Sequence, residues 1–191
     1  MKTTNMQVVR IAFTVMLLAC ALLAQVAPKP APAAWQTTVQ HRLPLYGHRN
    51  WIVVADAAYP AYSQSGIETI VVNQDLPSVV KYVAHAISSS KHVRATVFVD
   101  QELQFVQETD YPGVTALREA ITQTFAKSSL STVPHAESIA KIDDAGKTFR
   151  VLFIKTNTTI PYTSVFLRLD CGYLTDEVDK KIKDAMAAAS K

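Results

Sequence analysis

The segment LYGHRNWIVVADAAYP, residues 45–60, contains two side chains that could do chemistry. His48 follows a glycine in an expected loop, where a histidine can face a ligand instead of packing in the core. Asp56 ends a β-branched apolar run, at a position where a buried strand would still be apolar. An imidazole titrates near neutrality and can both accept and donate a proton, and a carboxylate can hold hydroxyl groups. The segment therefore indicates an acid–base or binding site for a small polar molecule.

Two further candidates lie far along the chain. His135 follows Pro134 at the expected start of a helix, and Tyr162 follows Pro161 before a C-terminal strand. Taken singly, each of the four candidates has an ordinary structural explanation, as a surface or turn histidine, a turn carboxylate, a helix cap or a packing tyrosine. Their arrangement together is what favours a functional site.

The elements that must position these residues alternate between strands and helices. Apolar, β-branched runs predict strands at 51–57, 67–73, 92–100 (with 103–106 as a candidate continuation), 148–156 and 162–173. Helical spacing of apolar residues predicts helices at 76–90 and 111–129. Further helices are expected at 35–44, at 135–143 (ended by the turn residues DDAG) and at the C-terminus. This order predicts a single layered α/β domain with a largely parallel or mixed sheet flanked by helices. In such sheets ligands gather beyond the carboxyl ends of strands, where Asp56 falls.

Charge and motifs argue against several classes of function. The formal net charge is +3 and no basic stripe is present, so nucleic acid is not an expected partner. Motifs for phosphate loops, dinucleotide binding, zinc proteases, serine hydrolases and CxxC redox chemistry are absent, and the five histidines lack metal-ligand spacing. We therefore expect no metal and no organic cofactor. His92 is expected on the surface, and Cys171, in a strand, is expected to be a buried inert thiol.

The first 34 residues resemble an export signal followed by a linker. Lys2 and Arg10 precede the apolar stretch 11–27, which leads into PKPAPAA. LLAC at 17–20 also resembles a bacterial lipobox, which would make Cys20 a lipid-bearing N-terminus. Periplasmic or secreted export, lipid anchoring through Cys20 and an uncleaved anchor all remain open. In each case the expected domain is 35–191, and its contact with a membrane would run only through this N-terminal segment.

Together, the Gly-His pair at 47–48, Asp56 and the Pro-Tyr pair at 161–162 resemble the layout of the RbsD/FucU family, the ribose pyranases and fucose mutarotases. LYGHRNWIVVADAAYP is similar to the family's Gly-His start, apolar strand and Ala-Asp pair. IPYTSVFL, at 160–167, is similar to its Pro-Tyr segment before an apolar strand. The similarity covers roughly residues 35–173, and its two ends are more specific than its middle.

The resemblance implies a role for each matching residue. His48 matches the catalytic histidine, and Asp56, His135 and Tyr162 match groups that bind the sugar. The family's asparagine two positions after the tyrosine is Ser164 here, which keeps a hydroxyl donor and acceptor but has a shorter reach. This departure, like the export signal, leaves the identity of the sugar open.

The spacing of His48 and Asp56 raises a geometric question. An extended run over residues 51–56 would separate its ends by roughly 16 Å, at about 3.3 Å per residue. Either the 45–50 loop folds back over the strand end, or neighbouring subunits complete each site. The resemblance implies the second, because the family forms ring-shaped homo-oligomers, commonly pentamers stacked into decamers, with sites shared between subunits.

The leading hypothesis is a monosaccharide isomerase that interconverts anomers, or pyranose and furanose rings, without a cofactor. His48 would act as acid and base, with Asp56, His135, Tyr162 and Ser164 holding the sugar. A non-catalytic saccharide-binding or transport-associated protein of the same fold is the second hypothesis. A structural ring protein with a vestigial pocket is the third.

Overall fold

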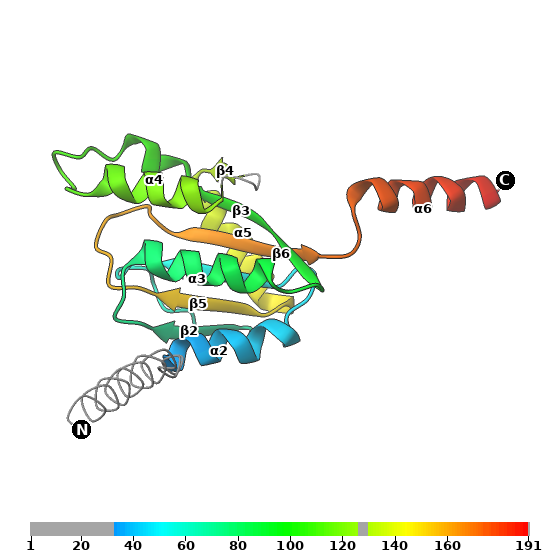
Figure 1. The fold of residues 1–191 in the computed structure, drawn as a ribbon, viewed down its shortest axis with the longest axis horizontal. Helices are drawn as coiled ribbons and strands as arrows, with labels where there is room; N and C mark the ends of the chain where they lie inside the picture. The colour runs from blue at the N-terminus through cyan, green and yellow to red at the C-terminus, as the bar shows by residue number, and fades with distance from the viewer. Residues whose placement is uncertain (1–32, 126–129, 191) are drawn as a thin grey trace, which may run out of the picture. The chain divides into compact units, whose positions relative to one another are not determined.

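The computed structural model describes residues 33–125 and 130–190, and Ala34–Lys191 forms one compact unit. Six strands of this unit form one mixed sheet in the order β2-β5-β1-β6-β3-β4 (Figure 1). Their bounds are β1 Trp51–Ala55, β2 Ile67–Val71, β3 Val93–Asp100, β4 Leu130–Val133, β5 Val151–Lys155 and β6 Val165–Cys171. Strand β6 runs antiparallel to both neighbours, β1 and β3, whereas the β1–β5, β2–β5 and β3–β4 pairs are parallel. The expected α/β domain with a mixed sheet is thereby confirmed.

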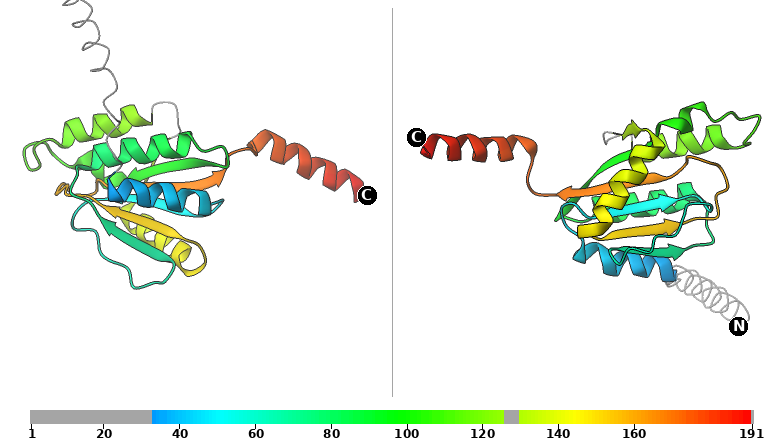
Figure 2. Two further views of the ribbon diagram at one scale, coloured as in Figure 1. Left: turned by 60° about the horizontal axis from the view of Figure 1, so that its bottom comes forward. Right: turned by 180° about the vertical axis from the view of Figure 1, so that it is seen from behind.

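Helices cover both faces of the sheet, as the views in Figures 1 and 2 show. Their bounds are α2 Ala34–Arg42, α3 Leu76–Ser88, α4 Val114–Thr124, α5 His135–Thr148 and α6 Asp176–Ala189. Helices α2, α3 and α4 pack on one face in a single apolar cluster that includes Ile52 and Val54 of β1. Helix α5 packs on the other face, where Ile142 meets Trp51 and Val53. The alternation along β1 is the period-two pattern of a strand that is covered on both sides.

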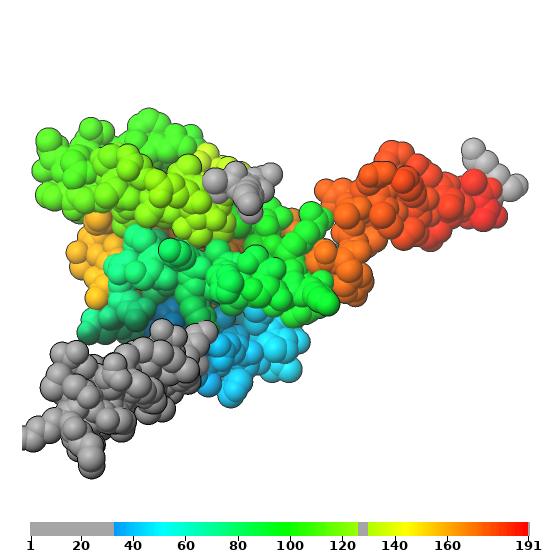
Figure 3. All heavy atoms as spheres, in the orientation of Figure 1, coloured from blue at the N-terminus to red at the C-terminus, as the bar shows by residue number. Residues whose placement is uncertain are grey.

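Local chemistry explains where helix α3 begins. The side chain of Asp75 accepts a hydrogen bond from the Ser78 backbone N–H at 2.9 Å, and Pro77 occupies the first turn. Apolar side chains at helical spacing then point at the sheet, and Val79, Val80 and others are fully buried. Figure 3 shows α3 and α4 side by side on this face. Both predicted helices are present, although α4 ends at Thr124 and residues 126–129 lie outside the described range.

Two sequence-based expectations about local structure are wrong, and one strand was missed. Residues Gln101–Phe105 form a 3₁₀ helix, η2, and do not extend β3. The DDAG residues at 143–146 lie inside α5, because Gly146 lets the helix approach β2; a Cβ there would come within 2.6 Å of the Ile67 side chain. Strand β4 was not expected, since LSTV at 130–133 is short and only half-buried at its two apolar residues.

The C-terminal helix α6 has no buried residue. Its charged residues pair along the helix at i,i+4 spacing, for example Lys181 with Glu177 at 2.6 Å. The predicted export signal, including Cys20, lies outside the described residues except for positions 33 and 34. Among the helices that the structure describes, none is both long enough and apolar enough to span a membrane.

Candidate functional site

The carboxyl ends of β1 and β3 meet at the start of β6. Val54 of β1 and Val99 of β3 both pair with Val165, the first residue of β6. The next polar residues along β1 and β3 are Asp56 and Asp100, so the two carboxylates reach the same edge of the sheet. This is the position at which α/β sheets collect their ligands.

Asp56 is oriented by two hydrogen bonds. Its Oδ1 accepts the backbone N–H of Ala58 at 2.9 Å, and its Oδ2 accepts the hydroxyl of Ser164 at 3.3 Å. Ser164 is 1% exposed, whereas Asp56 is half-buried. The carboxylate is therefore held in place and remains partly exposed, and the fold brings Asp56 and Ser164 together from positions 108 residues apart.

His135, the first residue of α5, is held at three points. Its backbone N–H donates to both carboxylate oxygens of Glu102, at 3.1 and 3.0 Å. Its ring Nδ1 lies 2.7 Å from Oδ2 of Asp100. Its ring also meets that of Tyr162 edge to face, with centroids 5.2 Å apart. Asp56, Asp100, His135, Tyr162 and Ser164 are called the strand-end cluster below.

Asp100 is fully buried, which is unusual for a carboxylate. Burial raises the pKa of this carboxyl, while His135 and the hydroxyl of Ser138 act in the opposite direction and Glu102 adds to the rise. A buried charge requires a partner, and Nδ1 of His135 provides one at 2.7 Å from Oδ2 of Asp100. Asp100 is therefore directed into the protein interior beside His135, whereas Asp56 is partly open to solvent.

Tyr162 adopts a backbone conformation that is uncommon for a residue with a side chain. Its φ is 59°, in the left-handed region, and 38% of the residue is exposed. Strain of this kind is found at functional sites, where the surrounding structure holds it in place. The turn presents the phenol beside His135, as a ligand-binding role would require.

An aromatic layer supports the segment that follows Asp56. Tyr59 packs on Phe153 with ring centroids 4.9 Å apart, and Tyr62 packs on the same ring at 5.3 Å. Burial raises the pKa of the Tyr59 hydroxyl, and the Tyr62 hydroxyl and the negative charge of Asp100 raise it further. The layer packs the loop after β1 against Phe153 of β5.

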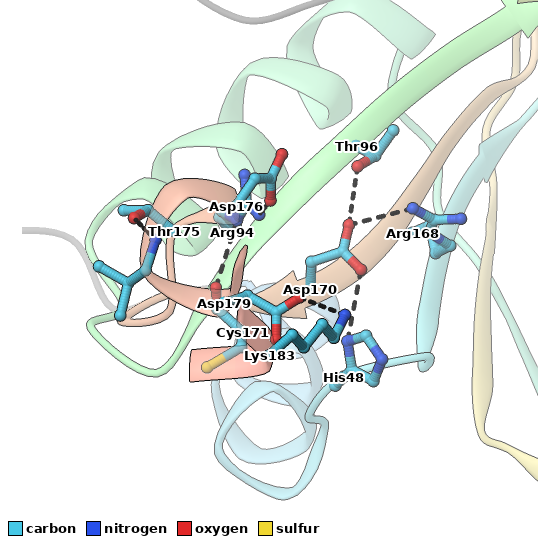
Figure 4. Close-up of polar contacts among 11 residues, drawn as sticks. His48, Arg94, Thr96, Arg168, Asp170, Cys171, Thr175, Asp176, Asp179 and Lys183 are labelled. Carbon is cyan, nitrogen blue, oxygen red and sulfur yellow. Dashed lines mark hydrogen bonds and ion pairs between the residues drawn. The ribbon is translucent and has the colours of Figure 1, made fainter. Parts of the chain in front are cut away.

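His48 lies elsewhere, next to the C-terminal end of β6 (Figure 4). Its Nδ1 is 3.4 Å from Oδ1 of Asp170, and its side chain is 56% exposed. Oδ2 of Asp170 accepts hydrogen bonds from Thr96 at 2.7 Å and from Arg168 at 3.3 Å. A carboxylate held in this way is suited to orienting an exposed imidazole.

One chain does not bring His48 to the strand-end cluster. Ser164 and Asp170 are six positions apart along β6, which is about 20 Å in an extended strand. The backbone N–H of Arg49 donates to Leu169 at 2.8 Å, so the loop that carries His48 is fixed at the far end of the sheet. The 45–50 loop thus does not fold back over Asp56, and His48 and Asp56 of one chain lie near opposite ends of β6.

The loop before His48 is supported by His92. Nε2 of His92 lies 3.1 Å from the carbonyl oxygens of both Leu43 and Tyr46. The expectation of a surface histidine is therefore wrong, because His92 is half-buried and joins the start of β3 to this loop.

Cys171 is a free thiol but only half-buried, so the expectation of a buried thiol is also wrong.

Three functional candidates were missed in the sequence, namely Asp100, Glu102 and Asp170. A usable signal existed for Asp100, since VFVD ends an apolar strand with a carboxylate just as WIVVAD does. Glu102 was missed because the strand was assumed to continue, and Asp170 was missed because it lies inside a strand.

Among the described residues, no group of three or more His, Cys, Asp or Glu side chains is placed to hold a metal. A hollow of about 990 Å³ lies between α3 and α4, and its lining includes none of the cluster residues or His48.

The fold is that of a small α/β protein in which polar side chains gather at one edge of a mixed sheet. A family model described as the RbsD / FucU transport protein family matches residues 8–172. The chain belongs to this family, which confirms the resemblance seen in its motifs. No protein of curated function matches the chain significantly.

Solved structures of similar fold include sugar complexes. RbsD from Bacillus subtilis, complexed with D-ribose, is 16% identical, covers 78% of this chain and 100% of its own, and superposes with a TM-score of 0.52. The fucose mutarotase from Streptococcus pneumoniae, in complex with L-fucose, is 16% identical and covers 79% and 99% of the two chains, with a TM-score of 0.49. FucU from Bifidobacterium longum is 14% identical and covers 70% and 92%, with a TM-score of 0.47. At 16% identity, the similarity to RbsD shows a shared fold and nothing more.

Proposed function

We propose that this protein is a monosaccharide isomerase that interconverts sugar anomers, or pyranose and furanose rings. The observation that carries the proposal is the gathering of Asp56, His135, Tyr162 and Ser164 at one sheet edge in a member of the RbsD/FucU family. RbsD from Bacillus subtilis, whose fold is similar, is complexed with D-ribose, and this supports a sugar as the ligand.

The residue types suit the reaction. Ring opening needs a proton to leave the anomeric hydroxyl and a proton to reach the ring oxygen, which an imidazole near neutrality can manage. Asp56 would accept hydrogen bonds from sugar hydroxyls, and Tyr162 and Ser164 would donate and accept them. The chemistry requires no metal or organic cofactor.

The proposal requires more than one chain at each site. His48 is fixed at the sheet end opposite to Asp56, so we propose that His48 of one subunit acts as acid and base at the strand-end cluster of a neighbour. A closed homo-oligomer, of the pentamer or decamer kind, would repeat this contact around its ring. We further propose that residues 1–34 direct export, with or without a lipid on Cys20.

Saturation-transfer NMR on a panel that includes D-ribose and L-fucose tests the proposal. We expect the wild-type protein to accelerate anomer or ring exchange of at least one sugar, and His48→Ala to lose the acceleration. His85→Ala, which removes an exposed histidine of α3, is the matched control and should behave as wild type. Exchange that the wild type accelerates no more than His48→Ala, for every sugar, would refute the isomerase.

A binding or transport-associated protein of the same fold is the second candidate. It is favoured by the location of His48, which leaves the cluster of a single chain without this residue, and by Ser164 in place of the family's asparagine. Calorimetry separates the two functions. A sugar that binds the wild type without any faster exchange would establish the binding protein in place of the enzyme.

A further inference from the structure

His135 is held by Glu102, Asp100 and Tyr162, which is more support than a residue needs in order to make one hydrogen bond to a bound sugar. We infer that His135 is a second proton-transfer group of the site, and that the buried carboxylate of Asp100 is its positioning residue. The inference rests on the proposed sugar isomerisation and assigns to His135 a task beyond binding.

The first support is the Asp100–His135 pair. The 2.7 Å separation of Nδ1 and Oδ2 is that of a charge-assisted hydrogen bond. Asp100 is 0% exposed, so water cannot replace the imidazole as its partner. A carboxylate that accepts the Nδ1 proton selects one tautomer of the neutral ring and leaves a lone pair on Nε2. A carboxylate paired with a histidine in this way orients the ring and stabilises the imidazolium that forms during proton transfer.

The second support is the immobilisation of the ring and of its backbone. Glu102 holds the His135 backbone N–H with both oxygens, and the Tyr162 ring meets the imidazole at an interplanar angle of 84°. The His135 side chain is nevertheless 33% exposed, so it can reach a ligand. Groups that transfer protons need this combination of fixed orientation and access.

Two histidines can divide the chemistry of ring opening if His135 starts neutral and His48 starts as the imidazolium, because the total charge of the site then stays constant. Nε2 of His135 takes the proton of the anomeric hydroxyl, the O–H electron pair becomes part of the new carbonyl, and the bond between C1 and the ring oxygen breaks. The electron pair of that bond stays on the ring oxygen, which receives a proton from His48 of the neighbouring chain. Ring closure returns both protons, so the protein and the sugar each recover their starting protonation states.

Asp100→Asn tests the inference because it preserves shape and removes the negative charge. For a sugar whose exchange the wild type accelerates, with D-ribose and L-fucose as the first probes, we expect kcat to fall about 100-fold, the range of general acid–base effects, with KM changed only slightly. Asp144→Asn, which alters an exposed carboxylate of α5, the helix that begins with His135, is the control and should retain full activity. Full activity in Asp100→Asn would overturn the inference.

A second measurement does not depend on activity. Magic-angle-spinning NMR of protein with ¹⁵N-labelled histidine reports which ring nitrogen carries the proton, and His135→Gln identifies the signal of His135. We expect the proton on Nδ1 in the wild type and a changed pattern in Asp100→Asn. A proton on Nε2 in the neutral ring of the wild type would overturn the role of Asp100. Failure of the proposed function is distinguishable, because the wild type itself would then accelerate no exchange whatever the tautomer of His135.

Discussion

Glu102 is predicted to stabilise the N-terminus of helix α5, although it is not part of that helix. The helix has Pro134 before it, no side-chain cap of its own, and His135 as its first residue. Both oxygens of Glu102, from the 3₁₀ helix η2, accept the His135 N–H instead. Replacing Glu102 with alanine should therefore loosen the helix end and the imidazole that it carries.

The size of the effect follows from the contact. A hydrogen bond to a charged group contributes about 1.5–3 kcal/mol, and a negative charge near a helix N-terminus adds to this. Because the contact is only partly buried, water can solvate part of the freed N–H, and we expect Glu102→Ala to cost about 2 kcal/mol. Glu102→Gln keeps one neutral acceptor and should cost about 1 kcal/mol.

Urea unfolding at a fixed protein concentration measures the difference, since an oligomer's stability depends on concentration. Glu137→Ala is the control: it removes a first-turn carboxylate that contacts Lys141 and not His135, and should cost about 0.5 kcal/mol. If Glu102→Ala lowers the free energy of unfolding by no more than the control does, Glu102 does not specifically stabilise the start of α5 at His135. We expect Glu102→Ala also to weaken sugar binding several-fold in calorimetry.

Two further predictions concern the framework of the fold. Gly66→Ala should cost at least about 2 kcal/mol in urea unfolding, because its Cβ would overlap the backbone carbonyl oxygen of Gly146; a neutral result would show that α5 and β2 can separate freely. Arg42 hydrogen-bonds Glu68 and lowers its pKa, so this contribution to stability is present above the ordinary value of 4.5 and is lost as the pH falls through the lowered pKa. Glu68→Gln should therefore lose less stability than the wild type on acidification, and equal acid sensitivity of the two would contradict the assignment.

The sequence predicted most of the core elements because their signals are local. Strand β1 and helix α3 have continuous or periodic apolar residues, and Asp75 and Pro77 mark where the helix begins. The predicted end of helix α5, at residue 143, came too early. Gly146 is a glycine because the helix packs closely against Ile67 of β2, and this contact cannot be seen in the sequence around the glycine.

The sequence identified some residues of the candidate site and missed others, and the difference has a physical cause. Asp56 and Tyr162 follow from strand ends and from family motifs, which are local in the sequence. The pairing of Asp100 with His135 joins residues 35 positions apart, and that of His48 with Asp170 joins residues more than a hundred apart. Such pairs depend on strand order, which the sequence pattern did not specify.

If two chains complete each sugar site, mixing two inactive variants of the protein should restore part of the activity. His48→Ala and Asp56→Asn are each expected to accelerate no sugar exchange. When the two variants are co-expressed in equal amounts, about a quarter of the shared sites would combine an intact His48 with an intact Asp56. We predict that saturation-transfer NMR will find about a quarter of the wild-type exchange rate in the mixed assembly. Mixed oligomers without any recovered exchange, formed from two inactive variants of an active wild type, would contradict a site shared between chains.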